Sequence, residues 1–500
     1  MKTFRLTSHL SLIALTCVIV SQTANAQIFP ALNAREGKGN QDSSSEQVKE
    51  ANSVDVQVRL SNPTMLSGKN EINYVRITLT GSEPAEAPAA PPVNVAIVID
   101  TSGSMQGSKI VQARNAAIAA IDRLRNQDIV SVVLYDSVVT VLVPATKASD
   151  RELIKSKIRS IKADGSTALF AGVAKGAAEV RKFLSNGSVN RVILLSDGQA
   201  NIGPSSPREL ERLGASLVKE GISVTTLGLG LGYNEDLMSG LAATGSGNHI
   251  FVEEAQDLVA VFNNEFNDLM SVVASDFKIK VTTNDGVRPV RVLGTKADIV
   301  GHDVYLPLAQ LYSNQERYFV LEVEVDSAEN AKQANLLSVN VDYQDMINGS
   351  SASYKTDVGV KYTRDIAEVK AHRDHETYAY CSVQIANEKN VRATALRDAG
   401  QIEEAQQLLT SNAATLEEVM RECQENDALG VLPELEMNMN YNRDSAELVK
   451  NKDWNRSRKV MRGKQNEIQS QQSSGMMDYI FGGSKTRSKS DTSSGSSSSK

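Results

Sequence analysis

The sequence predicts an α/β fold in which a parallel-sheet unit is inserted into an all-β sandwich and is followed by a helical C-terminal region. Between about residues 93 and 275, apolar strand runs alternate with amphipathic helices, which is typical of a parallel sheet covered on both faces. On either side of this unit, apolar and polar residues alternate with a period of two, as in strands that have one buried face.

The first 26 residues are predicted to be a signal peptide. Lys2 and Arg5 precede the apolar run Leu10–Val20, and small residues end the stretch at Ala26, after which cleavage is expected. The protein is therefore expected to be exported, to the periplasm or outside the cell. No later apolar run approaches the ~20 residues of a membrane span, so no transmembrane segment is expected in the mature chain.

Charge and composition restrict the class of partner. Lys and Arg together number 53 against 60 Asp and Glu, the net charge is -7, and aromatic residues make up 5%. A chain with this balance has no overall basic field to hold a nucleic-acid backbone and few rings on which bases could stack. No nucleic-acid partner is expected.

The elements follow in order. Residues 27–52 are polar and aperiodic and are expected to be a flexible leader, and residues 53–83 carry the first sandwich strands. In the α/β unit, residues 93–275, strands are predicted at Val93–Asp100, Ile129–Tyr135, Val139–Val143, Val189–Ser196, Ile222–Leu229 and His249–Val252. Helices are predicted at Ile110–Leu124, Ala168–Leu184, Pro207–Lys219 and Ala255–Val273. Since no helix fits before Val139–Val143, that strand is predicted to be an antiparallel edge.

Residues 276–365 are predicted to complete the sandwich, because the two strands before the α/β unit are too few for an independent one. Residues 366–448 are predicted to form a helical hairpin region that braces the body, with a peptide-binding groove as the alternative. Residues 449–500, basic and then rich in Ser and Gly, are expected to be a disordered tail. Its basic residues are expected to be solvated, with contact to an anionic surface as the alternative: Lys452, Arg456, Arg458, Lys459, Arg462 and Lys464.

The motif that carries chemistry follows the first strand of the α/β unit. Asp100, Ser102 and Ser104 stand at its carboxyl end, the edge of an open α/β sheet where ligands bind. Alternate residues of an extended turn point the same way, so these three side chains can bring their oxygens to one point. Two other turns at the same edge supply Thr167 and Asp197.

Oxygen ligands of this kind suit a hard divalent cation, and Mg²⁺ requires about six of them. The alternative is that the side chains only cap helices, but capping does not require all three turns. Ser166 and Ser196 lie beside the candidate ligands and are interpreted as turn formers.

Over about Val93–Asp276, these turns resemble a von Willebrand factor type A (VWA) domain with an intact metal-ion-dependent adhesion site (MIDAS). The resemblance implies that Ser102, Ser104 and Thr167 bind the cation directly, and that Asp100 and Asp197 act largely through waters. The expected cation is Mg²⁺, with Mn²⁺ or Ca²⁺ as alternatives. Because neutral hydroxyls leave its charge poorly neutralised, an open coordination position attracts an acidic side chain of an extracytoplasmic protein partner.

Two cysteines remain once Cys17 is removed with the signal peptide. Cys381 and Cys423 are predicted to form a disulfide, since thiols tend to oxidise outside the cytoplasm. The alternative is a pair of buried free thiols.

The expected function is metal-dependent adhesion or scaffolding by a protein that is not an enzyme, because its histidines fall in no recognised catalytic motif. The arrangement resembles bacterial secreted proteins described as similar to calcium-activated chloride channel components. Two alternatives stay open. One is an accessory subunit of a metal-dependent enzyme, and the other is a structural envelope protein whose metal only stabilises the fold.

Overall fold

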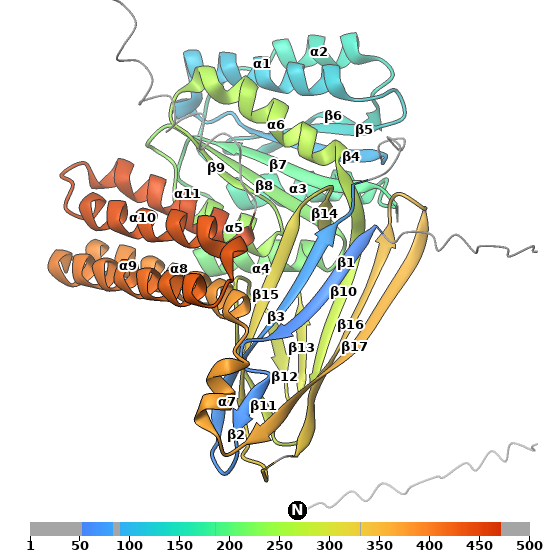
Figure 1. The fold of residues 1–500 in the computed structure, drawn as a ribbon. Coiled ribbons are helices and arrows are strands. Elements are labelled where there is room, and N and C mark those ends of the chain that lie inside the picture. The colour runs from blue at the N-terminus through green and yellow to red at the C-terminus, as the bar shows by residue number, and fades with distance from the viewer. Residues whose placement is uncertain (1–52, 84–90, 186, 331, 472–500) are drawn as a thin grey trace, which may run out of the picture. The chain divides into compact units, whose positions relative to one another are not determined.

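The computed structural model describes residues 53–83, 91–185, 187–330 and 332–471. These residues form an α/β part, a β-rich part and a C-terminal helical part (Figure 1). The predicted signal peptide and leader lie outside the described residues, as does the end of the predicted tail, residues 472–500. Within the described ranges, no helix combines the length and the apolar character that crossing a bilayer requires.

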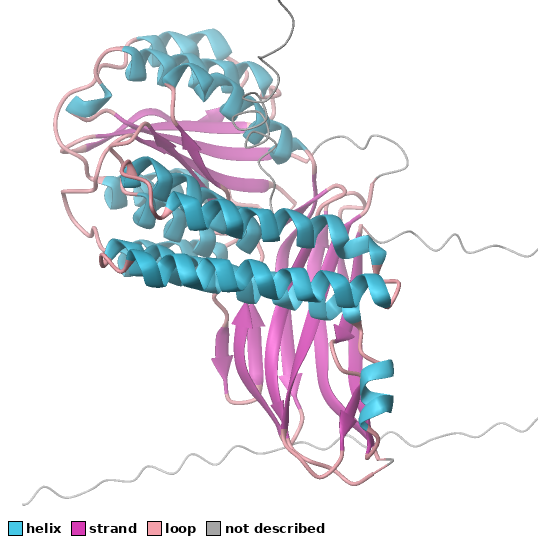
Figure 2. Cartoon of the chain, turned by 60° about the vertical axis from the view of Figure 1, so that its left-hand side comes forward, coloured by secondary structure: helices cyan, strands magenta, loops and turns pink. Residues whose placement is uncertain are grey.

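The α/β part is built on a six-stranded sheet. Its strands are β4 (Val93–Asp100), β5 (Ile129–Tyr135), β6 (Val139–Lys147), β7 (Val189–Ser196), β8 (Ile222–Leu229) and β9 (His249–Val252). They lie in the order β6-β5-β4-β7-β8-β9. All are parallel except β6, which pairs antiparallel with β5 and confirms the predicted edge strand. Every residue of β4, β7 and β8 is buried, because helices cover both faces of the sheet (Figure 2).

Each face of the sheet has its own apolar core. On one face lie α1 (Ser108–Arg123), α2 (Arg151–Arg159) and α6 (Leu258–Met270), which follows the short 3-10 helix η2 (Ala255–Asp257). On the other lie α3 (Leu169–Arg181), α4 (Pro207–Val218) and α5 (Glu235–Thr244). The apolar spacing predicted four of these helices and missed α2 and α5.

The β-rich part contains strands from both sides of the α/β part in sequence. They are β1 (Val54–Leu60), β2 (Thr64–Leu66), β3 (Glu71–Gly81), β10 (Val272–Thr283), β11 (Val287–Leu293), β12 (Asp298–Val300), β13 (Asp303–Leu306), β14 (Gln310–Tyr312), β15 (Glu316–Val325), β16 (Gln333–Asp345) and β17 (Ser350–Thr363). One sheet has the order β1-β3-β15-β11, and the other β12-β13-β10-β16-β17-β2, with β14 beside β10. Buried residues of both sheets belong to one apolar core.

The helical part begins with α7 (Ile366–Ala371) and α8 (His375–Asp398). Gly400 has a φ of +82°, a conformation that favours glycine, and it follows the end of α8 at Asp398. There follow α9 (Ile402–Glu425), the 3-10 helix η3 (Leu429–Val431), α10 (Leu432–Leu448) and α11 (Trp454–Ser470).

Helix α11 corrects the prediction of a disordered tail from residue 449 onward. The carboxylate of Asp453 accepts a hydrogen bond from the Arg456 N–H at 3.4 Å and caps the helix. Met461 and Ile468 are buried. Composition alone points to a solvated segment here, because it does not register a few apolar residues at helical spacing.

The structure also corrects the predicted disulfide, since Cys381 and Cys423 are both buried and free. The Cys423 thiol lies 3.6 Å from the carbonyl oxygen of His375, at the start of α8. Cys381 lies six residues farther along the same helix, about 9 Å along its axis. It packs against Tyr318 and Val320 of β15 instead.

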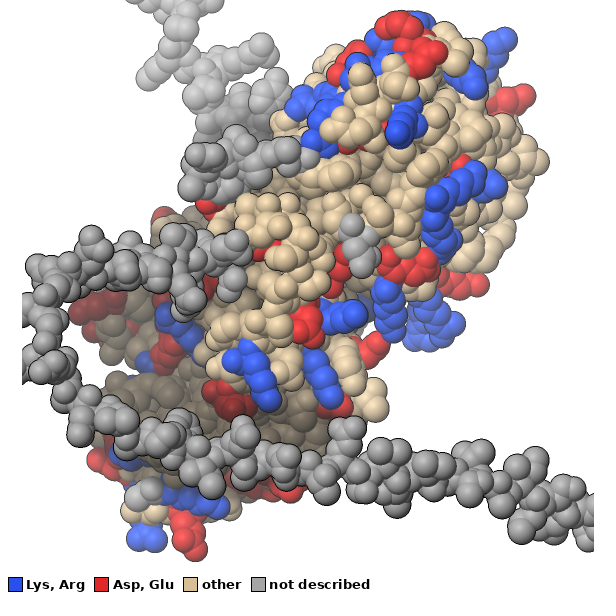
Figure 3. Space-filling model, turned by 90° about the vertical axis from the view of Figure 1, so that its right-hand side faces the viewer, with Lys and Arg blue, Asp and Glu red and all other residues tan. Residues whose placement is uncertain are grey.

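Charged side chains pair across the surface of the β-rich part. Arg291 lies 2.9 Å from Glu322, and Arg288 pairs with Glu324. On the face drawn in Figure 3, the acidic and basic side chains of the described residues are intermixed. Exposed pairs of this kind contribute little stability individually, so the apolar cores carry the fold.

Candidate metal centre

Three turns meet at the carboxyl edge of the α/β sheet. Asp100 ends β4, and the 3-10 helix η1 (Gly103–Met105) follows it before α1 begins. Thr167 lies just before α3, and Asp197 directly follows β7. Because β4 and β7 are parallel neighbours, their carboxyl ends lie side by side.

Backbone contacts tie the turns to one another. The Gly103 N–H donates to the Gly165 carbonyl at 2.9 Å, which joins the first turn to the second. Asn201, after β7, holds Thr167 twice. Its side-chain oxygen accepts from the Thr167 N–H at 2.9 Å, and its own N–H donates to the Thr167 carbonyl at 3.1 Å. The second turn is therefore held by both of the others.

The predicted ligands form a connected set of oxygens. The Ser104 hydroxyl donates to Asp197 Oδ1 at 2.7 Å and lies 3.1 Å from the Ser102 hydroxyl. Asp100 Oδ1 accepts from the Ser102 N–H at 2.8 Å. These bonds link the first turn to the third.

A single point beside Gly198, in the third turn, is close to oxygens from the first and second turns. A carbon placed there as a Cβ would lie 3.2 Å from the Thr167 hydroxyl, 3.5 Å from the Ser104 hydroxyl and 3.7 Å from Asp100 Oδ2. Glycine leaves this space free of side chain. The structure therefore brings together all five residues that the sequence singled out.

Asp100 is fully buried and held by donors on both oxygens. In addition to the Ser102 N–H, the Ser196 hydroxyl donates to Oδ2 at 2.7 Å and the Tyr135 hydroxyl at 3.4 Å. Burial raises the pKa of Asp100, while the bonds from Ser102 and Ser196 act in the opposite direction. Ser196 thus orients a candidate ligand, and its hydroxyl also accepts from the Gly198 N–H at 3.4 Å, as its interpretation as a turn former implies.

Comparison with known proteins identifies the α/β part. Residues 94–264 match the model of the von Willebrand factor type A domain. The chain contains a VWA domain. Such domains typically mediate protein–protein interactions and commonly bind a divalent metal ion at a MIDAS.

Sequence relatives match a minority of the chain. The chain is 29% identical to the uncharacterized protein YfbK of Escherichia coli (strain K12) over 196 residues. This match covers 39% of the chain and 34% of the length of YfbK. The chain thus spans about a third of this relative.

Two solved structures are similar over more of the chain. A von Willebrand factor type A protein from Catenulispora acidiphila has a TM-score of 0.59 and 17% identity, over 77% of this chain and 90% of its own. The ArnB paralog VWA2 from Sulfolobus acidocaldarius has a TM-score of 0.61 and 18% identity, over 83% of this chain and 98% of its own. At these identities the likeness concerns the fold, and it extends beyond the VWA domain.

Lys109 belongs to the site of the VWA domain, although the sequence analysis missed it. Its ammonium forms an ion pair with Asp197 Oδ2. The Lys109 side chain is 32% exposed, whereas that of Asp197 is completely buried. A lysine in the first turn of a surface helix gives no signal in sequence, because exposed helix positions commonly carry one.

Arg458, Lys459 and Arg462 of α11 lie against the VWA domain and are not solvated as predicted, whereas Lys452 and Arg456 are exposed. Lys459 is almost fully buried, and its ammonium lies 2.6 Å from Glu235 and 3.0 Å from the Tyr233 carbonyl. Arg458 pairs with Glu235 and with Asp236, both in the first turn of α5. The acidic partners are far away in sequence, so local composition did not indicate them.

Helix α11 also reaches a loop beside the candidate metal site. The Asn455 side chain donates to the Leu231 carbonyl at 3.1 Å, in the loop between β8 and α5. The next residue, Gly232, approaches the third turn, since a Cβ placed on it would lie 2.9 Å from the Asp197 carbonyl oxygen. This loop therefore lies between α11 and the backbone of a candidate ligand.

Proposed function

We propose that the protein mediates metal-dependent adhesion or scaffolding between proteins, with Mg²⁺ at the VWA domain and Mn²⁺ or Ca²⁺ as substitutes. The observation that supports this best is the point beside Gly198, within 3.7 Å of oxygens of Thr167, Ser104 and Asp100, together with the hydrogen bond that joins Ser104 to Asp197. Three hydroxyls and two carboxylates are hard donors, which match the preference of Mg²⁺ for oxygen. They suit a divalent cation better than a soft metal.

The hydroxyls and the carboxylates of the site would have different roles in holding such an ion. The hydroxyls of Ser102, Ser104 and Thr167 would bind it, with Asp100 and Asp197 placed to hold its waters. When bound, the ion supplies a positive centre that attracts a carboxylate. Because three of the five ligands are neutral, enough positive charge remains to bind an acidic side chain of a partner.

The proposal also includes the location of the protein and the arrangement of its domains. Residues 1–26 act as a signal peptide, so the partner is met outside the cytoplasm, and the chain acts without catalysing a reaction. The VWA domain is inserted in a β-sandwich, which is supported by the pairing of β3 with β15. The likeness to secreted proteins resembling calcium-activated chloride channel components is part of this proposal.

A substitution that adds one methyl group tests the metal site. Gly198→Ala places a carbon among the oxygens of Thr167, Ser104 and Asp100. We expect Mg²⁺ affinity, measured by calorimetry, to fall at least about tenfold, with little change in the melting temperature in EDTA. Ser166→Ala, beside Thr167, is the matched control and should bind Mg²⁺ normally.

Capture of partners from an extracytoplasmic extract then tests the function. The wild-type chain should retain a partner in Mg²⁺ and release it in EDTA, and Gly198→Ala should not retain it. Retention of the partner by Gly198→Ala would favour a structural role for the metal. Metal-dependent turnover of a substrate by the captured complex would favour an accessory subunit of an enzyme.

A further inference from the structure

Strand β15 presents a guanidinium on its apolar face. Side chains alternate between the faces of a strand, so Arg317 shares its face with Phe319 and Leu321, which are fully buried in the core of the β-rich part. Arg317 itself is 6% exposed. A buried charge is costly unless other groups pair with it.

Within the described ranges, this guanidinium has no hydrogen-bond acceptor for two of its nitrogens, Nε and Nη1. The Phe319 ring lies 5.9 Å from its central carbon and supplies no oxygen. Burial lowers the pKa of Arg317 to about 10, and the groups that oppose this shift are Tyr312 and Tyr318, not carboxylates. Arg317 is therefore a cation at neutral pH without an acidic partner among the described residues.

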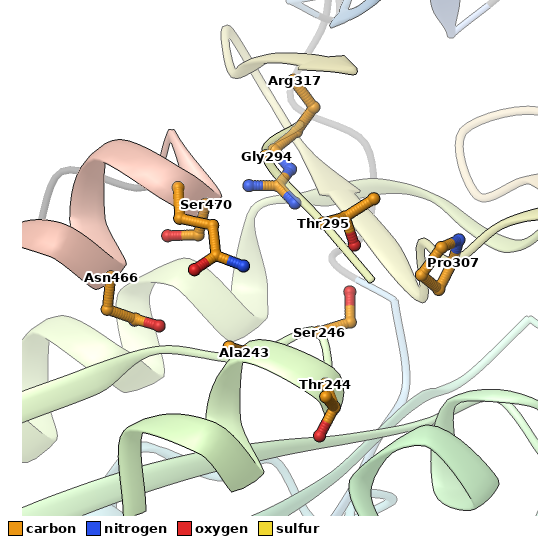
Figure 4. Close-up of a pocket in the computed structure, with 10 residues that line it drawn as sticks. Ala243, Thr244, Ser246, Gly294, Thr295, Pro307, Arg317, Asn466 and Ser470 are labelled. Atoms are coloured by element: carbon orange, nitrogen blue, oxygen red, sulfur yellow. The ribbon is translucent and has the colours of Figure 1, made fainter. Parts of the chain in front are cut away.

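The guanidinium faces a small cavity lined by both polar and apolar groups. The cavity has a volume of about 10 Å³, which is room for one particle the size of a water molecule. Figure 4 shows Arg317 pointing toward the space between Thr295 and Ser470, with Ser246 and Asn466 around the same space. The described residues that line it include hydroxyls and amides but no carboxylate.

The neighbouring groups offset only part of the charge. Helix α5 ends at Thr244 and α11 ends at Ser470, and both residues line the cavity. The carboxyl end of a helix carries a partial negative charge, which favours a cation. The Ser246 hydroxyl can donate a hydrogen bond to an anion. Its oxygen already accepts from the Ala309 N–H at 3.1 Å, and its own hydrogen remains available.

We propose that this cavity is a binding site for a small monovalent inorganic anion such as chloride. The ion accepts hydrogen bonds from Arg317 and from the hydroxyl of Ser246. Its size excludes sulfate and the carboxylate of a separate protein. Because the cavity is lined by the VWA domain, the β-rich part and α11, the bound ion stabilises the contact among all three.

Thermal unfolding of the full chain tests this site independently of the metal centre. In EDTA and at constant ionic strength, replacing gluconate by chloride should raise the melting temperature by about 2 to 4 °C and then saturate. Arg317→Gln should abolish this rise. Arg288→Gln, an exposed arginine on the neighbouring strand β11, should keep it. A rise that persists in Arg317→Gln, or no rise in the wild type, would overturn the proposal.

Crystals of the wild-type chain soaked in bromide give a direct test that does not depend on a variant folding. We expect an anomalous peak within hydrogen-bond distance of the Arg317 guanidinium. A water molecule at that place, or a carboxylate from a residue outside the described ranges, would show that the cation is satisfied without a free anion and would refute the site.

Discussion

Lys109 places a fixed positive charge beside the three turns of the candidate metal site. Its ammonium pairs with Asp197, a fully buried carboxylate and a candidate ligand. The same carboxylate also accepts from Ser104. A divalent cation in this place would therefore stand close to a fixed positive charge, and the two would compete for one carboxylate.

Lys109→Met should raise the affinity for Mg²⁺ about tenfold, because it removes this repulsion. In EDTA the same variant should melt at a lower temperature, because Asp197 is left buried without its counter-charge. Calorimetry and thermal melts measure the two effects. Lys157→Met, an exposed lysine of α2, should change neither. Weaker Mg²⁺ binding in Lys109→Met would mean that the lysine assists the ion.

His249 is expected to make the stability of the VWA domain depend on pH. It is buried in β9 and contacts the hydroxyls of Thr226 and Tyr233. Burial lowers its pKa to about 4, with Lys459 adding to this effect and Glu235 opposing it. In the unfolded chain a histidine has a pKa of about 6.5, so between these values the unfolded chain binds a proton that the folded chain does not.

The free energy of unfolding should therefore fall as the pH is lowered from about 6.5 to about 4, and the contribution of His249 should be fully present above this window. His249→Gln cannot take up the proton and should flatten this slope in denaturant melts. The comparison is best made in an Asp268→Asn background. Burial raises the pKa of Asp268 to about 7. Below this pH the folded chain binds a proton at Asp268 that the unfolded chain has already begun to lose, so the contribution of Asp268 to the free energy of unfolding falls as the pH rises. An unchanged slope in His249→Gln would contradict the assignment.

Among the elements, α11 shows most clearly that a local sequence pattern does not reveal contacts with distant parts of the chain. Its basic residues suggest a solvated segment, but their partners lie in the first turn of α5, more than two hundred residues earlier. Helices α1, α3, α4 and α6 were predictable because each has a regular apolar stripe. α2 was missed because only Ile154 and Ile158 are buried in it.

Lys459→Met should detach α11 from the VWA domain. Removing the buried ammonium leaves Glu235 with Arg458 as its remaining counter-charge and takes the donor away from the Tyr233 carbonyl, at a cost of about 2 kcal/mol. Hydrogen exchange should become faster in α11 and in the loop between β8 and α5. Glu235→Gln in the same chain should restore part of the protection, and Lys450→Met, an exposed lysine beyond α10, should leave it unchanged. Unaltered exchange in Lys459→Met would mean that α11 is held by other contacts.

For the whole molecule, the site was more predictable than its surroundings. Asp100, Ser102, Ser104, Thr167 and Asp197 were identified because residues at the carboxyl ends of parallel strands meet at one edge. The groups that hydrogen-bond to these residues or pair with their charge were not predictable. Ser196, Asn201 and Lys109 carry no motif, and their roles depend on which turns the fold brings together.

The position of β3 has a consequence for how the chain is made. This strand is hydrogen-bonded on one side to β1 and on the other to β15, which leaves the ribosome more than two hundred residues later. Until then, one edge of β3 has no partner from β15, while all of the strands and helices of the VWA domain are already available. The domain can thus fold as an early unit during translation, whereas the sheets around it close last and control the overall rate.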